Sequence, residues 1–208
     1  MVVVRTGRRP GNQDTREAIL AAARSAFAER GYDAASIRHI ATAANVDPAL
    51  VHHYFGTKDQ LFLAALDAPI DPARLVPQAI AGSQDGVGER LIRMLLSVWD
   101  SAAGGPAAAL LRSAVGNETM ARMMREFVVN RILKRVAKDL DLDPVEGPVR
   151  ANLVATQIGG LVMIRYILKI EPLASAPAEQ VVALIGPTVQ RYLFDPLPTA
   201  WTDQTRHG

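Results

Sequence analysis

Side chains that can bind an anion or recognise hydrogen-bonding groups gather in one short stretch of this 208-residue chain. Between Ser36 and Lys58 lie one arginine, adjacent histidines at 52 and 53, a tyrosine and several hydroxyl groups. Two histidines that are neighbours on a helix face different directions and make a poor metal pair. The set therefore offers hydrogen bonds and two fixed positive charges, which is the chemistry of binding and not of bond breaking.

The rest of the chain carries no recognisable catalytic motif. It has no cysteine, which excludes a disulfide framework, a thiolate zinc site and a cysteine nucleophile, and which fits a reducing compartment. No Gly-x-Ser-x-Gly sequence is present, and the glycine-rich stretch 82–88 lacks the lysine of a phosphate-binding loop. No histidine pair at i, i+4 encloses a glutamate. We expect no enzyme, no cofactor and no metal.

Three capping residues define the elements that position these side chains. Ser36, Asp47 and Thr57 each stand where a short helix must begin, and Gln60 completes a capping box with Thr57. Asn45 lies in the four-residue turn 44–47 and tolerates a positive φ, while proline 48 suits a first helical position. Two short helices joined by such a turn predict a helix-turn-helix, whose second helix enters the major groove of DNA.

The second helix of this motif has one apolar and one polar face. We expect an anchor that holds it from behind, formed by Val46, Leu50, Val51 and Phe55. The small residues at 48 and 49 allow close approach to base edges, and the basic side chains can reach bases or phosphates. An alternative for each polar residue taken singly is an ordinary solvated position. The predicted DNA contacts within the motif are Ser36, Arg38, Pro48, Ala49, His52, His53, Tyr54, Thr57 and Lys58.

The stretch from Thr15 to Leu66 resembles the TetR family of bacterial transcriptional regulators. Its most specific part is VDPALVHHYFGTKDQL, which is similar to the family's recognition helix, aromatic pair and following Ser/Thr-Lys. The resemblance implies an all-helical homodimer with a three-helix DNA-binding head, a larger helical body that binds a small molecule, and a dimer bundle built from the last two helices. Arg38, Ala49, His52, His53, Tyr54 and Lys58 match DNA-contact positions of the family.

Three residues depart from the family pattern. Asn45 stands where glycine is common, which a left-handed turn tolerates. Asp47 stands where Ser or Thr is common, so it caps the helix but brings a negative charge near phosphates. His52 stands where tyrosine is common, so a phosphate contact there would depend on pH near neutrality.

The N-terminal segment is locally basic although the formal net charge is only +2. Residues 1–13 contain no acid, and this composition suits an arm that becomes ordered on a polyanion. A solvated terminus is the equal alternative. The arginines of this predicted arm are Arg5, Arg8 and Arg9. The longest apolar run, 153–168, is interrupted by glutamine and arginine, so we expect a cytoplasmic protein without a membrane span.

Apolar residues recur every three or four positions along nearly the whole chain, which predicts an all-α fold. The first helix should begin at Asp14 and end at Gly31. A proline-containing break at 68–72 separates a head, residues 10–67, from a ligand-binding and dimerisation body, residues 72–195. In the body we expect helices over 73–81, 87–102, 106–116, 118–140, 147–170 and 177–194. The basic residues of 118–140 should form a solvated face.

Two sets of body residues are candidates for binding. A deformable pocket is predicted from methionine, aromatic and aliphatic positions, with plain core packing as the alternative. The pocket set is Leu95, Val98, Trp99, Leu111, Met120, Met123, Met124, Phe127 and Gln157. A dimer face is predicted along the last two helices, with packing inside one chain as the alternative. The dimer set is Leu153, Gln157, Gly160, Val181, Leu184, Ile185 and Val189.

These features predict a homodimeric repressor that reads a palindromic DNA operator and leaves it when an unidentified small molecule binds. Two recognition helices spaced by one DNA turn, ~34 Å, would read the two half-sites. The alternative is a helical interaction or ligand-sensing protein whose helix-turn-helix has lost DNA binding.

Overall fold

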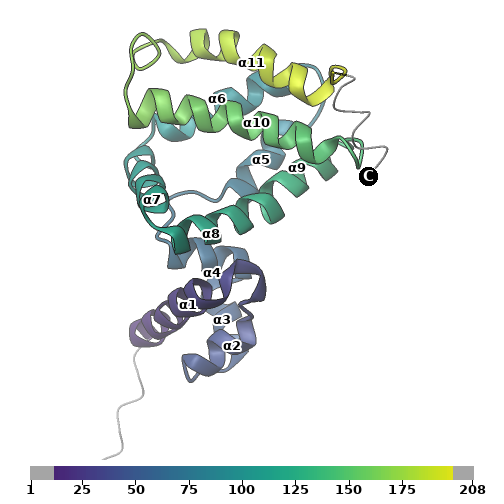
Figure 1. Cartoon of the computed structure of the whole chain (residues 1–208). Coiled ribbons are helices and arrows are strands. Elements are labelled where there is room, and N and C mark those ends of the chain that lie inside the picture. The colour runs from purple at the N-terminus through teal and green to yellow at the C-terminus, as the bar shows by residue number, and fades with distance from the viewer. Residues whose placement is uncertain (1–11, 199–208) are drawn as a thin grey trace, which may run out of the picture.

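The computed structural model describes residues 12–198, and within them the chain folds entirely into helices (Figure 1). The elements run α1 (Asn12–Ala34), α2 (Ile37–Ala43), α3 (Pro48–Phe55), α4 (Lys58–Ala65), α5 (Pro72–Ile80), α6 (Val87–Trp99), α7 (Gly104–Gly116), α8 (Glu118–Phe127), η1 (Val128–Leu133), α9 (Lys134–Asp139), α10 (Gly147–Val162), η2 (Met163–Ile167) and α11 (Ala178–Phe194). The predicted all-α class is confirmed.

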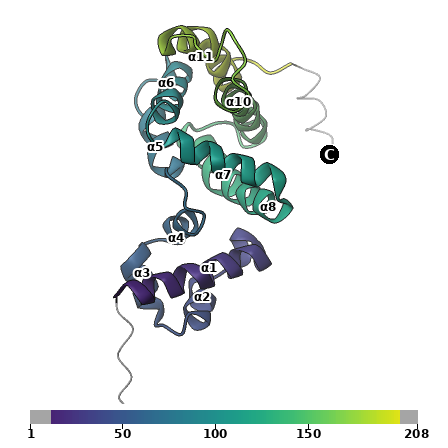
Figure 2. The same ribbon diagram turned by 90° about the vertical axis from the view of Figure 1, so that its left-hand side faces the viewer.

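Helices α1–α4, here called the head, lie at one end of the molecule, and the helices from α5 onward, here called the body, lie at the other. The view turned by 90° shows the same separation, with α4 between α1 and α5 (Figure 2). One apolar core fills the head and a second fills the body. Met123 and Phe127 of α8 belong to the head core, so α8 joins the two units.

The local signals of the helix-turn-helix act as predicted. The Ser36 side chain accepts from the His39 amide, and the Asp47 carboxylate accepts from the Ala49 amide at 2.7 Å. Thr57 and Gln60 form the expected capping box. Asn45 adopts a φ of 54°, the left-handed conformation that lets α3 leave α2 at a sharp angle.

Three helix predictions need correction. α1 begins at Asn12, so Asp14 lies in its first turn instead of capping it. At Gly31 the backbone kinks with a φ of 79°, and a short turn continues to Ala34. The helices predicted over 118–140 and 147–170 each contain a π-helical segment, η1 and η2, and the second ends at Ile167.

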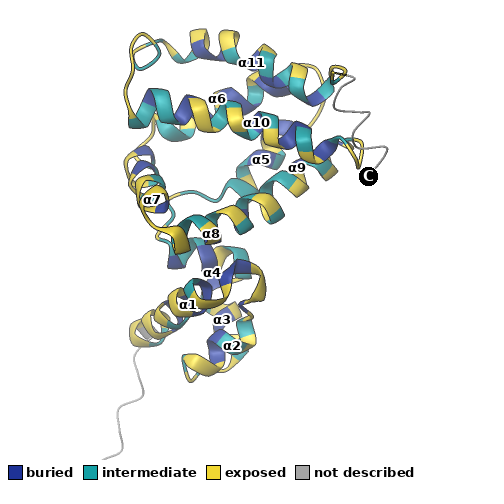
Figure 3. Ribbon diagram, viewed as in Figure 1, coloured by how far each residue is buried: buried dark blue, intermediate teal, exposed yellow. Residues whose placement is uncertain are grey.

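The body is held together chiefly by α6 packed on α11, with α10 beside them. Buried apolar side chains face the interior of this layer, and exposed stretches mark the outer faces of α10 and α11 (Figure 3). Within residues 12–198 no single helix is long and apolar enough to cross a membrane. The pair α6 and α7, bent by 97°, passes the same length and composition test only when taken together.

Candidate DNA-binding surface and ligand pocket

Helix α3 is fixed by two buried side chains and turns its other side outward. Val51 and Phe55 are buried in the head core, one turn apart. The small first residues, 48 and 49, and the two histidines then lie on the outer side, half-buried to exposed. Leu50 was expected among the anchors, but 39% of its surface is exposed. It lies one residue from Val51, and 100° of helical rotation carries it off the buried stripe.

Arg38 is exposed on α2, and its guanidinium makes no hydrogen bond or ion pair with residues 12–198. Its backbone carbonyl accepts from the Thr42 hydroxyl at 3.0 Å, a bond within the helix. A guanidinium without a partner among the described residues offers its donors to a base or a phosphate. Arg38 is therefore the best presented cation near α3.

The two histidines of α3 differ in what they can still bind. His52 Nδ1 lies 2.8 Å from the carbonyl oxygen of Gly56, so this nitrogen donates and Nε2 remains directed away. The ring of His53 contacts the ring of Tyr54 edge-on, with centroids 5.5 Å apart. Tyr54 is half-buried against the head core. His53 is thus the more accessible imidazole for a base edge.

Lys58 does not present its ammonium as predicted. Nζ donates to the Asp33 carbonyl at 3.0 Å and sits 4.6 Å from the centroid of the Tyr32 ring. Burial lowers the pKa of this ammonium. The side chain from the first turn of α4 points toward the Tyr32 ring of α1 and not outward, so in this structure its ammonium is not presented to a phosphate. The neighbouring Thr57 hydroxyl oxygen accepts from the Gln60 amide at 3.2 Å in the capping box, and this bond does not use its O–H donor.

The predicted arm residues Arg5, Arg8 and Arg9 lie outside the described residues.

A polar cluster that the sequence did not reveal joins the head to the body. The Tyr32 hydroxyl donates to the Asp59 carboxylate, and Arg131 Nε lies 3.0 Å from both groups. Burial, followed by the hydrogen bond to Asp59, raises the pKa of Tyr32. Nearby, the Asn130 amide donates to the Asp33 carboxylate at 2.6 Å. Because Asn130 and Arg131 lie 97 and 99 residues from Asp33 and Tyr32, no local pattern could identify these contacts.

The predicted solvated face of 118–140 is therefore wrong in part. Arg131 takes part in the junction, and Arg122 donates to the Ala28 carbonyl of α1 at 2.8 Å. Arg135 instead pairs with Asp139 on its own helix at 2.8 Å.

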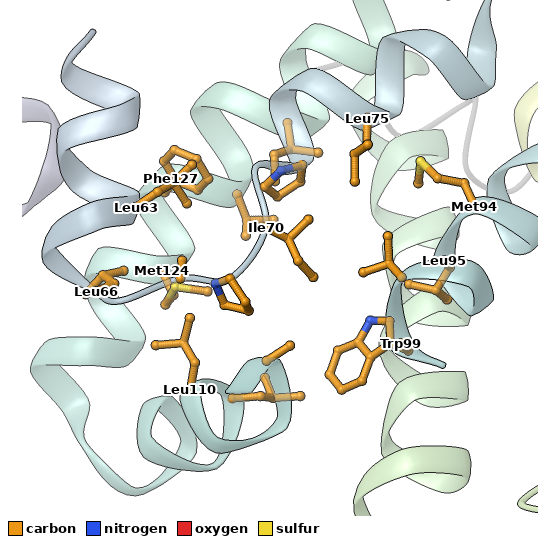
Figure 4. A pocket seen from close by; sticks show the side chains of 18 residues that line it. Leu63, Leu66, Ile70, Leu75, Met94, Leu95, Trp99, Leu110, Met124 and Phe127 are labelled. Carbon is orange, nitrogen blue, oxygen red and sulfur yellow. The ribbon is translucent and has the colours of Figure 1, made fainter. Parts of the chain in front are cut away.

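The body contains an apolar pocket of about 250 Å³ beside the junction with the head (Figure 4). Its walls come from α4, the 66–70 linker, α5, α6, α7, α8 and η1. Six of the nine predicted residues line it: Leu95, Val98, Trp99, Leu111, Met124 and Phe127. The other three do not line it. Met120 and Met123 line a separate depression between α1 and α8, and Gln157 lies on α10, away from the walls of this pocket.

The predicted dimer residues divide into two groups. Leu184 is 67% exposed, and Gly160, like its neighbour Gly159, is exposed with no atom within 4 Å of the position a Cβ would take. Leu153, Gln157 and Ile185 are half-buried. Val181 and Val189 are wrong, because both are completely buried within the body core of their own chain.

Comparison with known proteins matches both units to one family. Residues 19–65 match the model described as "Bacterial regulatory proteins, tetR family". Residues 85–193, more than half of the chain, match "Tetracyclin repressor-like, C-terminal domain".

Individual proteins show the same likeness over parts of the chain. The transcriptional repressor Rv3405c of Mycobacterium tuberculosis is 53% identical over 57 residues, which are 27% of this chain and 30% of that protein. The repressor AcnR of Corynebacterium glutamicum is 38% identical over 92 residues, 44% of this chain and 45% of that protein. The chain thus spans less than half the length of these curated relatives.

A crystal structure of a TetR-family regulator from Streptomyces coelicolor is 41% identical, with 91% of this chain and 100% of that chain covered and a TM-score of 0.46. On the two family matches, this chain belongs to the TetR family of bacterial regulatory proteins.

Proposed function

We propose that this chain is a sequence-specific, DNA-binding transcriptional regulator. In this proposal it acts as a homodimeric repressor that a small molecule releases from its operator. The observation that carries the proposal is the outward face of α3, which is capped by Asp47 and flanked by the exposed Arg38. A short, firmly capped helix with small residues at its start can enter a major groove and bring base edges within reach.

The contacts divide by chemistry. Pro48 and Ala49 reach a thymine methyl or a groove wall, and His53 donates to or accepts from a base edge. Arg38 binds a base or phosphate, while the protonated form of His52 can donate its Nε2–H to a phosphate. We place Ser36, Tyr54 and Thr57 next to the sugar-phosphate backbone of the DNA. Lys58 is left out of the side-chain contacts because of its bond to Asp33.

The same proposal assigns residues 10–67 to DNA binding and residues 72–195 to ligand binding and dimerisation, in a cytoplasmic protein. The dimer face is the exposed side of α10 and α11 around Leu184 and the two open glycines at 159 and 160. Glycine within a helix costs roughly 1 kcal/mol relative to alanine, and close approach of a second helix offsets that cost. Two heads held in this way would read a palindrome.

Ligand release needs a physical connection between pocket and head. Phe127 lines the pocket and is also a member of the head core, where its ring stacks on Phe62 with centroids 5.0 Å apart. Three residues further along, Asn130 contacts Asp33 of the head, and Arg131 follows. A ligand that displaces the pocket wall formed by α8 and η1 would therefore shift α1 and α4 relative to the body.

The test is selection of bound duplexes from a random or genomic pool, followed by affinity measurements at several salt concentrations. The variant Arg38→Ala is compared with Arg125→Ala, which removes the same charge from an exposed position of α8. The proposal predicts an enriched palindrome. It also predicts that Arg38→Ala lowers the slope of log affinity against log salt by about two per dimer, roughly one for each lost phosphate contact.

Arg125→Ala should leave both the affinity and the slope unchanged. If the folded wild-type protein enriches no duplex, or if the two variants behave alike, α3 and Arg38 do not form a DNA-reading surface.

A further inference from the structure

We propose that the effector is an uncharged, predominantly hydrocarbon molecule, somewhat larger than benzene, with no more than one hydrogen-bond acceptor. This inference rests on the proposed function, because it names the ligand of a regulator whose response to a ligand is itself proposed. It depends on the walls of the pocket and not on any relative.

No side chain lining the pocket is ionisable, and none is a hydroxyl or an amide. The lining comprises Leu63, Leu66, Ala68, Pro69, Ile70, Pro72, Leu75, Met94, Leu95, Val98, Trp99, Ala107, Leu110, Leu111, Met124, Phe127, Val128 and Ile132. These side chains enter the space from both sides of the 66–70 linker (Figure 4). Only the indole N–H of Trp99 offers a polar side-chain group, and it is a donor.

The backbone of the linker adds few donors. Pro69 and Pro72 have no N–H, and the amide of Ala68 already donates to the Leu63 carbonyl at 2.8 Å. A carboxylate, phosphate or ammonium placed here would lose its water without gaining an opposite charge. Transfer of an unpaired ion into such surroundings is strongly unfavourable, so the walls select against charged ligands.

Trp99 packs against a second aromatic ring, which restricts the movement of the indole. Its ring lies on that of Tyr166 at 5.2 Å between centroids, and the Tyr166 hydroxyl donates to Asp100 at 2.8 Å. Met94 and Met124 are deformable, so the remaining wall can fit either a chain or a ring. The site thus combines a single indole donor with an adaptable apolar surface.

The volume sets the size of the ligand. A cavity of about 150 Å³ accommodates benzene, so the ~250 Å³ here corresponds by proportion to about ten non-hydrogen atoms. Naphthalene and a medium-length alkyl ketone fall in this range. A ketone oxygen would also satisfy the Trp99 N–H.

The experiment measures binding to the full chain in the absence of DNA. Of the two tryptophans, Trp99 and Trp201, the second is replaced in a Trp201→Phe background, so that emission reports on the pocket alone. The probes are naphthalene and three alkyl compounds of similar length: 2-octanone, octanoate and octylammonium. The expected result is saturable binding of both neutral probes, with dissociation constants about tenfold or more below those of the two ions.

Two substitutions locate the binding. Ala107→Leu adds a side chain inside the pocket and should weaken 2-octanone binding by about tenfold, whereas Ala109→Leu makes the same change at an exposed position of α7 and should not alter it. The proposal is overturned if either ion binds as well as the ketone, if no neutral probe binds, or if Ala107→Leu binds like Ala109→Leu.

A second readout separates this inference from the proposed function. Operator DNA found by selection is titrated with each probe. Release by an ion but not by the neutral probes overturns the ligand class and leaves the regulator intact. Binding of the neutral probes by a protein that selects no DNA supports the ligand class and contradicts the proposed DNA-binding function.

Discussion

Replacing Gly88 by alanine should destabilise the body, because α6 and α11 cross there with backbone against backbone. A Cβ at Gly88 would overlap the carbonyl oxygen of Gly186 and lie 2.6 Å from the amide nitrogen of Gln190. Reciprocally, a Cβ at Gly186 would lie 2.8 Å from Cγ and 3.0 Å from Cα of Glu89. The Gly88 amide also donates to the Gln190 side chain at 2.9 Å, a bond that a shift would strain.

The expected change in the free energy of unfolding is the balance of two opposing effects. Overpacking costs about 1–3 kcal/mol, and the better helix propensity of alanine returns up to about 1 kcal/mol. Because the clash at Gly88 involves backbone atoms, no rotamer change relieves it, and we expect a net loss of about 1–2 kcal/mol in the free energy of unfolding. For a chain of this length that corresponds to a fall of roughly 2–8 °C in Tm.

The assay is urea unfolding followed by circular dichroism, at one fixed protein concentration because the proposed dimerisation would contribute to the apparent stability. The control is Gly105→Ala, at an exposed helical position with no atom within 4 Å of the added Cβ, which should be neutral or slightly stabilising. A Gly88→Ala protein as stable as the control would refute the close crossing.

Three further outcomes follow from the structure. Arg150 is buried and donates to Glu146 and to the carbonyls of Tyr192 and Asp195. Arg150→Met should therefore lower the free energy of unfolding, measured in urea, by about 1–3 kcal/mol, because it leaves these acceptors unsatisfied. Asp47→Ser should keep the cap of α3 and its stability while tightening binding to selected DNA at low salt, since it removes a negative charge near phosphates; unchanged affinity would contradict this.

Burial and the hydrogen bond to Asp100 raise the pKa of Tyr166 to about 12, whereas the pKa of a tyrosine in the unfolded chain is about 10. Between these values the unfolded chain has lost a proton that the folded chain keeps, so stability should fall as pH rises above about 10. Urea unfolding at about pH 9 and about pH 11 checks the sign, and Tyr166→Phe should reduce the slope.

How far the sequence could predict the site depended on the range of the interaction. The caps at Ser36, Asp47 and Thr57 and the turn at Asn45 were predictable, because each involves partners no more than four residues away. The direction of the Lys58 ammonium was not predicted, because its partner Tyr32 lies on another helix. The pocket was found only in part, since an apolar residue such as Met123 fits a core and a cavity wall equally well.

By itself, the sequence determined the helical class, the order of the helices and the presence of a helix-turn-helix, all of which arise from spacing and from local capping. Tertiary structure alone decided which neighbour covers each apolar face. It buried Val181 and Val189 while leaving Leu184 exposed on the same helix, and it placed Arg131 beside Tyr32 at the junction of head and body. The physical reason is that an amphipathic pattern specifies which side of a helix avoids water, whereas the partner on that side is chosen by packing among residues far apart in the chain.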